Sequence, residues 1–273
     1  MLEILNFNFF QNAILASILI SIACGCVGSL VMINRLISMA GGITHGAFGG
    51  IGMAFYFALP ILLSTSLFTL ILAFMVAYLS KYYPHRSDSI IAVIWALGMA
   101  IGIILIDLSP GYNNDLMAYL FGSILAVSYD DLLLMLICDL IFMILIICFY
   151  RQFEIISFDN EFAQTRGINA SLFYYILIFM IALCIVMSIR LVGLILIIAL
   201  LSIPSFIAEG LSKKLGLMMF YASILSLIFC LVGLIFSYIF NLSSGACIIF
   251  TACIGFVIYL CFNTLKNHLY ILK

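Results

Sequence analysis

The chain has 273 residues, of which 67% are hydrophobic and only 8% are charged, and its formal net charge is −1. A soluble globular domain carries about 25% charged residues, so this composition excludes a water-soluble protein and predicts one that is surrounded by the lipid bilayer. The balanced charge, with no basic run longer than Lys213–Lys214, excludes a nucleic-acid-binding protein.

Long apolar runs follow one another along the whole chain. A membrane-spanning helix needs about 20 mostly apolar residues, so we expect an all-α integral membrane protein with about nine transmembrane helices. Strands of a membrane β-barrel would be shorter and would alternate apolar with polar residues. We treat residues 1–273 as a single transmembrane domain. In chain order the runs are Ala13–Ile33, Leu36–Leu59, Pro60–Leu79, Ser89–Ile106, Leu132–Tyr150, Leu172–Ile189, Leu191–Ala208, Leu215–Phe240 and Ala246–Leu265.

Basic residues occur in alternate loops, which predicts the orientation of the chain, because cytoplasmic loops carry an excess of Lys and Arg. The opposite turns carry acids or no charge, apart from Arg190. An outside N-terminus and an inside C-terminus fit nine spans if the stretch Leu116–Tyr129 does not cross the membrane. Because that stretch has only about 14 residues, we expect a half-membrane helix that lines a pathway. The expected cytoplasmic residues are Arg35, Lys81, Arg86, Arg151, Arg166, Lys213, Lys214, Lys266 and Lys273.

The second run contains a dense cluster of glycines, from Gly41 to Gly52, around His45. Small residues let helices approach closely, and this packing role explains most glycines of the spans. An ionisable side chain inside an apolar span is costly and generally faces an interior pathway. Neutral imidazole is a ligand of zinc and other late transition metals. His45 is therefore a candidate metal ligand, and a hydrogen bond to a neighbouring helix is an equally good explanation.

Three aspartates are further candidates. Asp88 opens the span Ser89–Ile106, where its carboxylate complements the helix dipole; a metal-ligand role is the second interpretation. Asp107 ends that span and could attract cations at the mouth of a pathway. Asp139 lies in the middle of a later span, where it must be protonated or paired, and we predict that it also belongs to the pathway.

The loop Arg151–Ala170 is amphipathic and predicts a short cytoplasmic helix that docks on a soluble partner. Asp159 can cap this helix, Glu161 lies in its first turn, and Gly167 can end it. The chain has neither a G-x-x-x-x-G-K-[ST] phosphate loop nor an H-E-x-x-H motif, so we expect a non-catalytic protein. The nine cysteines form no C-x-x-C pair, and we interpret them as small apolar residues.

Five segments together resemble bacterial zinc-uptake ABC transporter permeases, within the zinc/manganese/iron permease family. The most specific of them reads DLMAYLFGSILAVSYDDL, Asp115–Leu132. The others are Gly28–Phe55 around His45, the Asp-led span Asp88–Ile106, the coupling-loop pattern FAQTRGI at Phe162–Ile168, and LVGLILIIALLSIPSFIA at Leu191–Ala208.

The resemblance implies a type II ABC importer permease fold and a homodimer in the bacterial inner membrane, with several spans in each copy. It also implies cytoplasmic ATP-binding subunits and an external metal-binding protein as partners. Zinc would be the transported substrate, with no permanently bound cofactor. The alternatives are manganese or iron(II) as the substrate, or a secondary transporter driven by the membrane potential or by protons. Docking on the ATP-binding subunit would use Phe158, Asp159, Glu161, Phe162, Ala163 and Gly167.

The chain departs from the family pattern one helical turn before His45. The family commonly has an acid at that position, and this chain has Gly41. Because the pair of ligands is broken, we expect either that another residue completes the metal site, for which Asp88 is the candidate, or that the channel binds the ion weakly.

Overall fold

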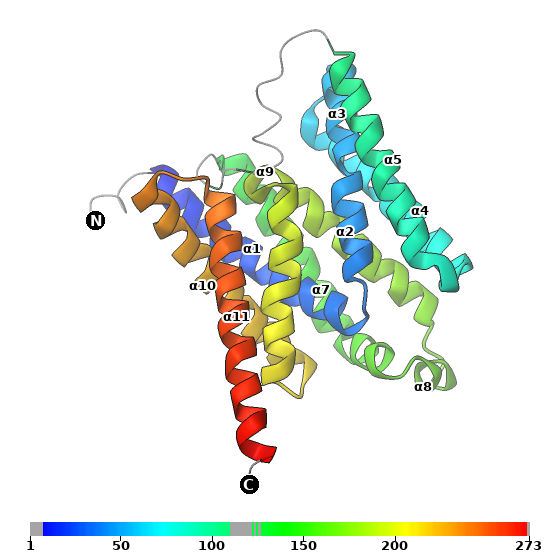
Figure 1. Ribbon diagram of the computed structural model, residues 1–273. Coiled ribbons are helices and arrows are strands. Elements are labelled where there is room, and N and C mark those ends of the chain that lie inside the picture. Colours follow the sequence, from blue (N-terminus) through cyan, green and yellow to red (C-terminus); the bar gives the residue numbers. More distant parts are fainter. Residues whose placement is uncertain (1–7, 110–121, 123, 125–126, 272–273) are drawn as a thin grey trace.

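The computed structural model describes residues 8–109, 122, 124 and 127–271, and every long element in this part of the chain is an α-helix. The prediction of an all-α fold is therefore confirmed for these residues (Figure 1). The elements are α1 (Asn8–Ile33), α2 (Ile37–Gly46), α3 (Phe48–Tyr56), α4 (Ile61–Tyr82), the 3-10 helix η2 (Pro84–Arg86), α5 (Ser87–Asp107), α7 (Tyr129–Phe158), α8 (Asn160–Thr165), α9 (Ala170–Leu211), α10 (Leu215–Phe240) and α11 (Ser244–Ile271).

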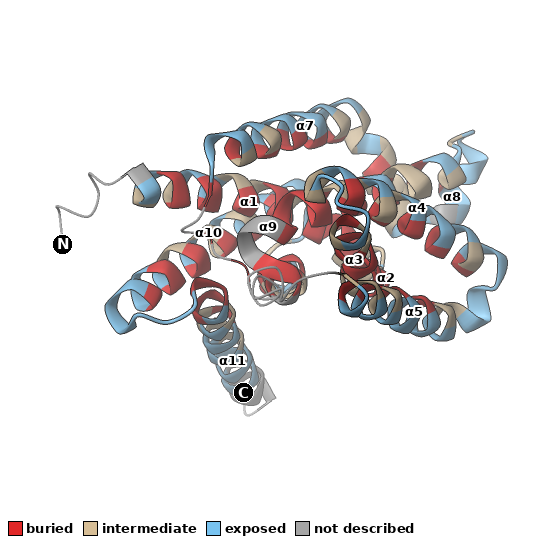
Figure 2. Ribbon diagram, turned by 90° about the horizontal axis from the view of Figure 1, so that it is seen from above, coloured by how far each residue is buried: buried red, intermediate tan, exposed pale blue. Residues whose placement is uncertain are grey.

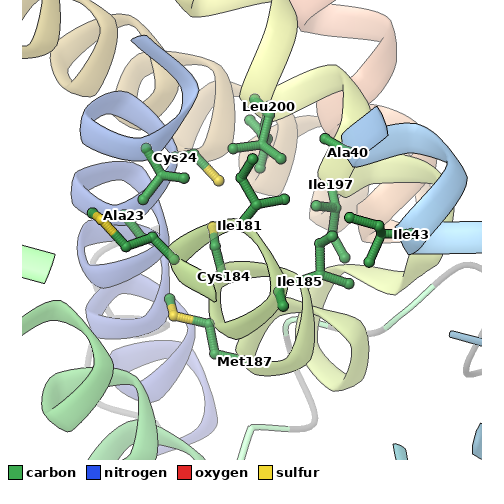
Figure 3. Packing of buried hydrophobic residues seen from close by; sticks show 14 of the residues in the cluster. Ala23, Cys24, Ala40, Ile43, Ile181, Cys184, Ile185, Met187, Ile197 and Leu200 are labelled. Atoms are coloured by element: carbon green, nitrogen blue, oxygen red, sulfur yellow. The ribbon is translucent and has the colours of Figure 1, made fainter. Parts of the chain in front are cut away.

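Helices α1 and α9 form the centre of the molecule. Helix α1 packs against α7, α9 and α10, and 72% of its most apolar stretch is buried, compared with 22% for α11 at the periphery (Figure 2). The space between α1 and the two arms of α9 is filled by side chains such as Cys24, Ile181 and Leu200 (Figure 3). Ala40 and Ile43 of α2 reach the same cluster, which joins α2 to the core.

The expected count of nine transmembrane helices is not confirmed. Seven helices in the described part of the chain are long and apolar enough to cross a membrane. The predicted span Leu36–Leu59 consists of two short helices, α2 and α3, because the helix is interrupted at Ala47. The predicted span Leu191–Ala208 corresponds to Leu196–Leu211, an apolar helix shorter than 18 residues. Sequence hydropathy located these segments, but it did not show where their backbones break.

Gly193 breaks α9 into two arms. Its φ of 75° and ψ of 165° lie outside the helical region, in a conformation that only glycine adopts readily. The first arm, Ala170–Ile189, is long enough to cross a membrane, and the second is Leu196–Leu211. The bend reverses the chain between the two arms, so both can pack in the core (Figure 1). The predicted boundary between two runs at Arg190 is thus close to the actual break.

Helices α2 to α5 form a second group beside the core, in which α5 packs against α2, α3 and α4. In Figure 1 the α1–α2 turn, η2, α8 and the α9–α10 turn lie toward the same, lower end of their helices. These segments carry Arg35, Arg86, Arg166 and the pair Lys213–Lys214. We call this end the basic end; its composition agrees with the predicted sorting of basic residues. The predicted half-membrane helix Leu116–Tyr129 lies largely outside the described residues.

The predicted cytoplasmic loop Arg151–Ala170 begins with eight residues that continue α7. Helix α7 changes direction at Phe149, where the backbone is not helical, and then extends to Phe158. Helix α8 follows after Asp159, whose Oδ1 accepts a hydrogen bond from the backbone N–H of Phe162 at 2.9 Å. Gly167 has a φ of 73° and follows the end of α8. The predicted cap at Asp159 and the predicted stop near Gly167 are therefore present.

Candidate functional site

His45 lies in the last turn of α2, at the place where the chain passes into α3. Its side chain is half-buried, whereas the residues on both sides of it, Thr44 and Gly46, are buried. The imidazole stacks on the indole of Trp95 in α5, with ring centroids 4.5 Å apart and an angle of 9° between the planes. Two helices thus determine the position of the one histidine in the glycine-rich span.

Close contact between glycines brings these helices together. A methyl group added at Gly98 of α5 would lie 2.7 Å from the Cα of Gly46, and one added at Gly52 would lie 2.7 Å from the Cα of Gly102. Because real side-chain carbons do not approach so closely, backbone packs directly against backbone here. We call this contact, formed by Gly46 and Gly52 with Gly98 and Gly102, the glycine interface. The packing role predicted for the glycines is therefore found at these positions.

Gly41 differs from the glycines of this interface. A methyl group at Gly41 would meet only the Cδ1 of Ile198, at 3.8 Å, which is an ordinary van der Waals distance. Packing does not require glycine at this position, which is one helical turn before His45. The Cβ of an acidic residue would fit at position 41, so a lack of space for that carbon does not explain why this chain has glycine there.

The imidazole of His45 forms no hydrogen bond with another side chain in the part of the chain that the structure describes, and its visible partner is the ring of Trp95. A hydrogen bond to a neighbouring helix, the second explanation for a histidine at this depth, is thus not found among these residues. Neither ring nitrogen therefore has a hydrogen-bond partner among the described residues. Stacking on an aromatic face holds an imidazole in one orientation without using those nitrogens.

Asp88 is not brought to His45. It lies in the first turn of α5, is exposed, and precedes Trp95 by seven residues, which is about 10 Å along a helix axis. Asp88 and Trp95 are on the same face of α5, but the carboxylate lies nearer the basic end. No group of three or more His, Cys, Asp or Glu side chains that could hold a metal ion occurs among the described residues. A ligand pair of His45 and Asp88 stays a prediction that this conformation does not bring together.

The other two aspartates lie in different surroundings. Asp107 is the last residue of α5, exposed at the end opposite to Asp88. Asp139 is 5% exposed, on the side of α7 that faces the core, and neither of its carboxyl oxygens has a hydrogen-bond partner among the described residues. It lies within electrostatic reach of the thiols of Cys24, Cys26 and Cys138. Asp139 therefore belongs to the helix core and not to the surroundings of His45, and its predicted pathway role stays a prediction.

The predicted docking residues form a protruding helix at the basic end. Phe158 and Phe162 are 65% and 44% exposed, and the guanidinium of Arg166 lies 5.2 Å from the centre of the Phe162 ring. Asp159, Glu161 and Gly167 are exposed as well. Ala163 is fully buried, so it packs on the inner side of α8 and is not exposed to a partner. Two large apolar rings, one at the end of α7 and one in α8, are therefore exposed among polar neighbours.

Sequence reasoning missed two residues of this arrangement. Trp95 is the single tryptophan of the chain, and its spacing from Asp88 and Gly102 places all three on one face of α5, which was a usable signal. Asn34, in the turn before α2, donates a hydrogen bond from its Nδ2 to the Oγ of Ser157 at the end of α7, at 2.9 Å. This contact joins the turn before the histidine helix to the residues before α8, and no sequence pattern indicated it.

Known proteins with a similar chain include membrane components of metal transport systems. The uncharacterized membrane protein slr2045 of Synechocystis sp. is 48% identical over 96% of this chain and 94% of its own length. The manganese transport system membrane protein MntC of Listeria monocytogenes is 30% identical over 93% of this chain and 91% of its own. Among solved structures, PsaBC from Streptococcus pneumoniae in complex with Fab superposes with a TM-score of 0.83 at 30% identity, covering 93% of this chain and 91% of that one.

The model of the ABC 3 transport family matches residues 6–263, which is nearly the whole sequence. The resemblance to metal ABC transporter permeases that the sequence motifs indicated is thereby confirmed. The half-exposed histidine, the glycine interface and the protruding α8 thus lie within a fold that is shared with transport permeases. The chain belongs to the ABC 3 transport family, as a membrane permease related to those of metal ABC transporters.

Proposed function

We propose that this chain forms the translocation pathway of an ATP-driven importer for manganese in the bacterial inner membrane. The observation that carries the proposal is His45, a half-buried imidazole whose nitrogens have no hydrogen-bond partner among the described residues, in a permease with several relatives named for manganese transport. A lone histidine suits a transported ion better than a resident one, because an ion that must leave cannot be held by a full set of ligands.

Zinc is the second candidate substrate, because neutral imidazole suits zinc at least as well, whereas manganese favours carboxylate and other oxygen ligands. No carboxylate of the described residues lies beside His45. The preference of imidazole for zinc thus supports the zinc prediction made from the sequence. The names of the relatives support the manganese proposal. Iron(II) is a further alternative.

A second copy of the chain is part of the proposal. Helix α5 packs one face against α2 and α3, and large apolar side chains elsewhere on it, such as Val93 and Ile104, are 64% and 56% exposed. Trp95 is itself 41% exposed, so the stacked pair reaches the surface of a single chain. A homodimer that covers this surface would enclose the histidine within a pathway. The symmetry of such a dimer would also place a second His45 near the first.

The energy source lies on another subunit in this proposal. The exposed rings of Phe158 and Phe162 form an apolar contact that fits a groove on a cytoplasmic ATP-binding subunit. The metal would arrive from an external binding protein at the end opposite to α8. A secondary transporter is disfavoured, because it would not need such a docking helix.

The test measures uptake of radiolabelled manganese and zinc into proteoliposomes that contain the chain and its ATP-binding subunit, supplied with the loaded binding protein. We expect ATP-dependent uptake that vanadate blocks. His45→Ala should lower it by roughly 10- to 100-fold, the range seen when the coordination of a metal is disturbed. His85→Ala is the matched control, since His85 is exposed on η2 and should leave uptake unchanged.

Uptake that continues in the presence of vanadate would contradict an ATP-driven importer and favour a secondary transporter. Equal uptake by the wild type and the His45→Ala variant would contradict a pathway through this histidine. A preference for zinc over manganese at equal free concentrations would replace the substrate but leave the rest of the proposal intact.

A further inference from the structure

A cavity of about 320 Å³ opens at the basic end, between the ends of α1, α7 and α9 and the start of α10. Three exposed cations contribute to its lining, Arg35, Lys213 and Lys214, together with one acid, Glu209. Leu215 and Met218 are 1% and 3% exposed and give the cavity an apolar floor. None of the three cations forms an ion pair within the described part of the chain.

The start of α10 adds to the positive potential of this cavity. Lys214 is the N-cap residue of this 26-residue helix, and no side chain caps the first turn. The N-terminus of a helix carries a partial positive charge and free N–H groups, which attract anions. The lining has three positive side chains and one negative side chain, a difference of two positive charges, so the helix and the side chains favour the same sign of ligand.

The backbone at Arg35 is unusual for a residue with a side chain. Arg35 has a φ of 57°, and the N–H of Leu36 bonds to the carbonyl of Val31 while that of Arg35 bonds to Met32. These bonds form a Schellman motif, in which the left-handed position is usually glycine. An arginine at this position is strained, and strained residues concentrate at binding sites. The sharp turn brings its guanidinium to the cavity.

We propose that this cavity binds the phosphate group of an anionic phospholipid from the inner leaflet. Cations that line the cavity would pair with the phosphate, and the apolar floor would accept the first carbons of the acyl chains. The cavity lies at the basic end, where three apolar helices end and a fourth begins, so we expect it near the lipid headgroups. Basic pockets between transmembrane helices on the cytoplasmic side are known to select such lipids.

The position of the cavity suggests what the lipid does. Phe158 belongs to the lining and is the last residue of α7, directly before Asp159 and α8. A bound headgroup would therefore contact both the turn that leads to α2 and the residues that lead to the docking helix. The inference does not depend on which metal is transported.

The test uses the purified full-length chain in nanodiscs that contain phosphatidylglycerol and phosphatidylcholine in equal amounts. Native mass spectrometry counts the lipids that stay bound. We expect phosphatidylglycerol to be retained, and Lys213→Gln with Lys214→Gln to weaken its retention by about fivefold for each charge removed. Arg86→Gln is the matched control, because it removes a cation of the same end that does not line this cavity.

Glu209→Gln protects the test from a folding artefact, since the removal of the one acid should increase phosphatidylglycerol retention. A decrease in this variant would overturn the proposal in favour of a zwitterionic lipid whose ammonium group needs Glu209. If millimolar inorganic phosphate displaces the bound phosphatidylglycerol as effectively as added phosphatidylglycerol does, that result would overturn the proposal in favour of a site for a free phosphate ion. Equal retention in the double lysine variant and the Arg86→Gln control would show that the cavity holds no lipid.

Discussion

The middle of the core and the glycine interface differ in what fills the space between their helices. Around α1 and α9, branched side chains such as Ile181, Ile185 and Leu200 fill the space between backbones (Figure 3). Between α2, α3 and α5, Gly46 and Gly98 bring the backbones into direct contact. The side chains of Ile91 and Phe48 pack against glycines beside this contact. The same chain thus separates some helices by side chains and lets others touch directly through glycines.

This difference shows how the position of His45 is maintained. A core of flexible side chains can adjust to a changed volume by moving rotamers, whereas two backbones in contact cannot yield without moving a whole helix. The imidazole of His45 and the indole of Trp95 project from the two helices that meet at the glycine interface. The 4.5 Å spacing between the two rings therefore depends on the glycines of this interface.

The largest effect is expected from Gly98→Val, which would separate α5 from α2. The added side chain would overlap the backbone of Gly46, so the unfolding free energy should fall by at least about 1–3 kcal/mol, and transport should be lost. Thermal unfolding of the purified protein and metal uptake measure the two effects. Gly41→Ala is the matched control, because its methyl group has room; it should be neutral or slightly stabilising. Similar losses in both variants would show that the interface is not special.

A smaller effect is expected from Trp95→Leu, which keeps the glycine interface but removes the ring that orients His45. An aromatic stack contributes about 0.5–1.5 kcal/mol beyond its burial, so the apparent KM for the metal should rise by roughly two- to tenfold. The unfolding temperature should change little, because Trp95 is partly exposed. Trp95→Phe restores an aromatic face and should recover most of the affinity. An unchanged KM in the leucine variant would separate the stack from metal binding.

The next test concerns the hydrogen bond between the turn before α2 and the end of α7. Asn34→Leu and Ser157→Ala each remove the hydrogen bond that joins the turn before α2 to the end of α7. Such a bond contributes about 1 kcal/mol, and we expect ATP hydrolysis to continue while fewer metal ions are imported for each ATP. The double variant should be no worse than the worse single variant. Ser171→Ala is the control, since it removes the contact of Lys81 with Ser171 at the same end.

The smallest effect is expected from Asp139→Asn in the core. Neither carboxyl oxygen of Asp139 has a hydrogen-bond partner among the described residues, and the amide has almost the same shape. Stability should change by less than about 0.5 kcal/mol, and uptake by less than twofold, because no partner is lost. A strong loss of uptake in this variant, with normal unfolding, would support the predicted pathway role of Asp139 and place function in the core as well as at the glycine interface.

Hydropathy alone determined that this protein lies in a membrane and consists of helices, because lipid leaves a backbone few other ways to satisfy its polar groups. The cap at Asp159 and the stop near Gly167 were predictable too, since both follow from bonds within a few residues. The number of helices that span the membrane was not predictable from the sequence. Whether an apolar run stays one helix depends on local backbone geometry, as at Ala47 and Gly193, which a mean hydropathy does not contain.

For the candidate site, too, the sequence identified some features and only the structure showed the others. The sequence alone identified His45, because an ionisable group in an apolar span is costly wherever the helix packs. Only the tertiary structure showed that Trp95 stacks on it, that Asp88 lies about two turns away, and that Asn34 connects α2 to α7. These relations join residues far apart along the chain, and they depend on how closely the helices approach. That approach is decided by backbone contacts between glycines such as Gly46 and Gly98, whose partners can be found only in three dimensions.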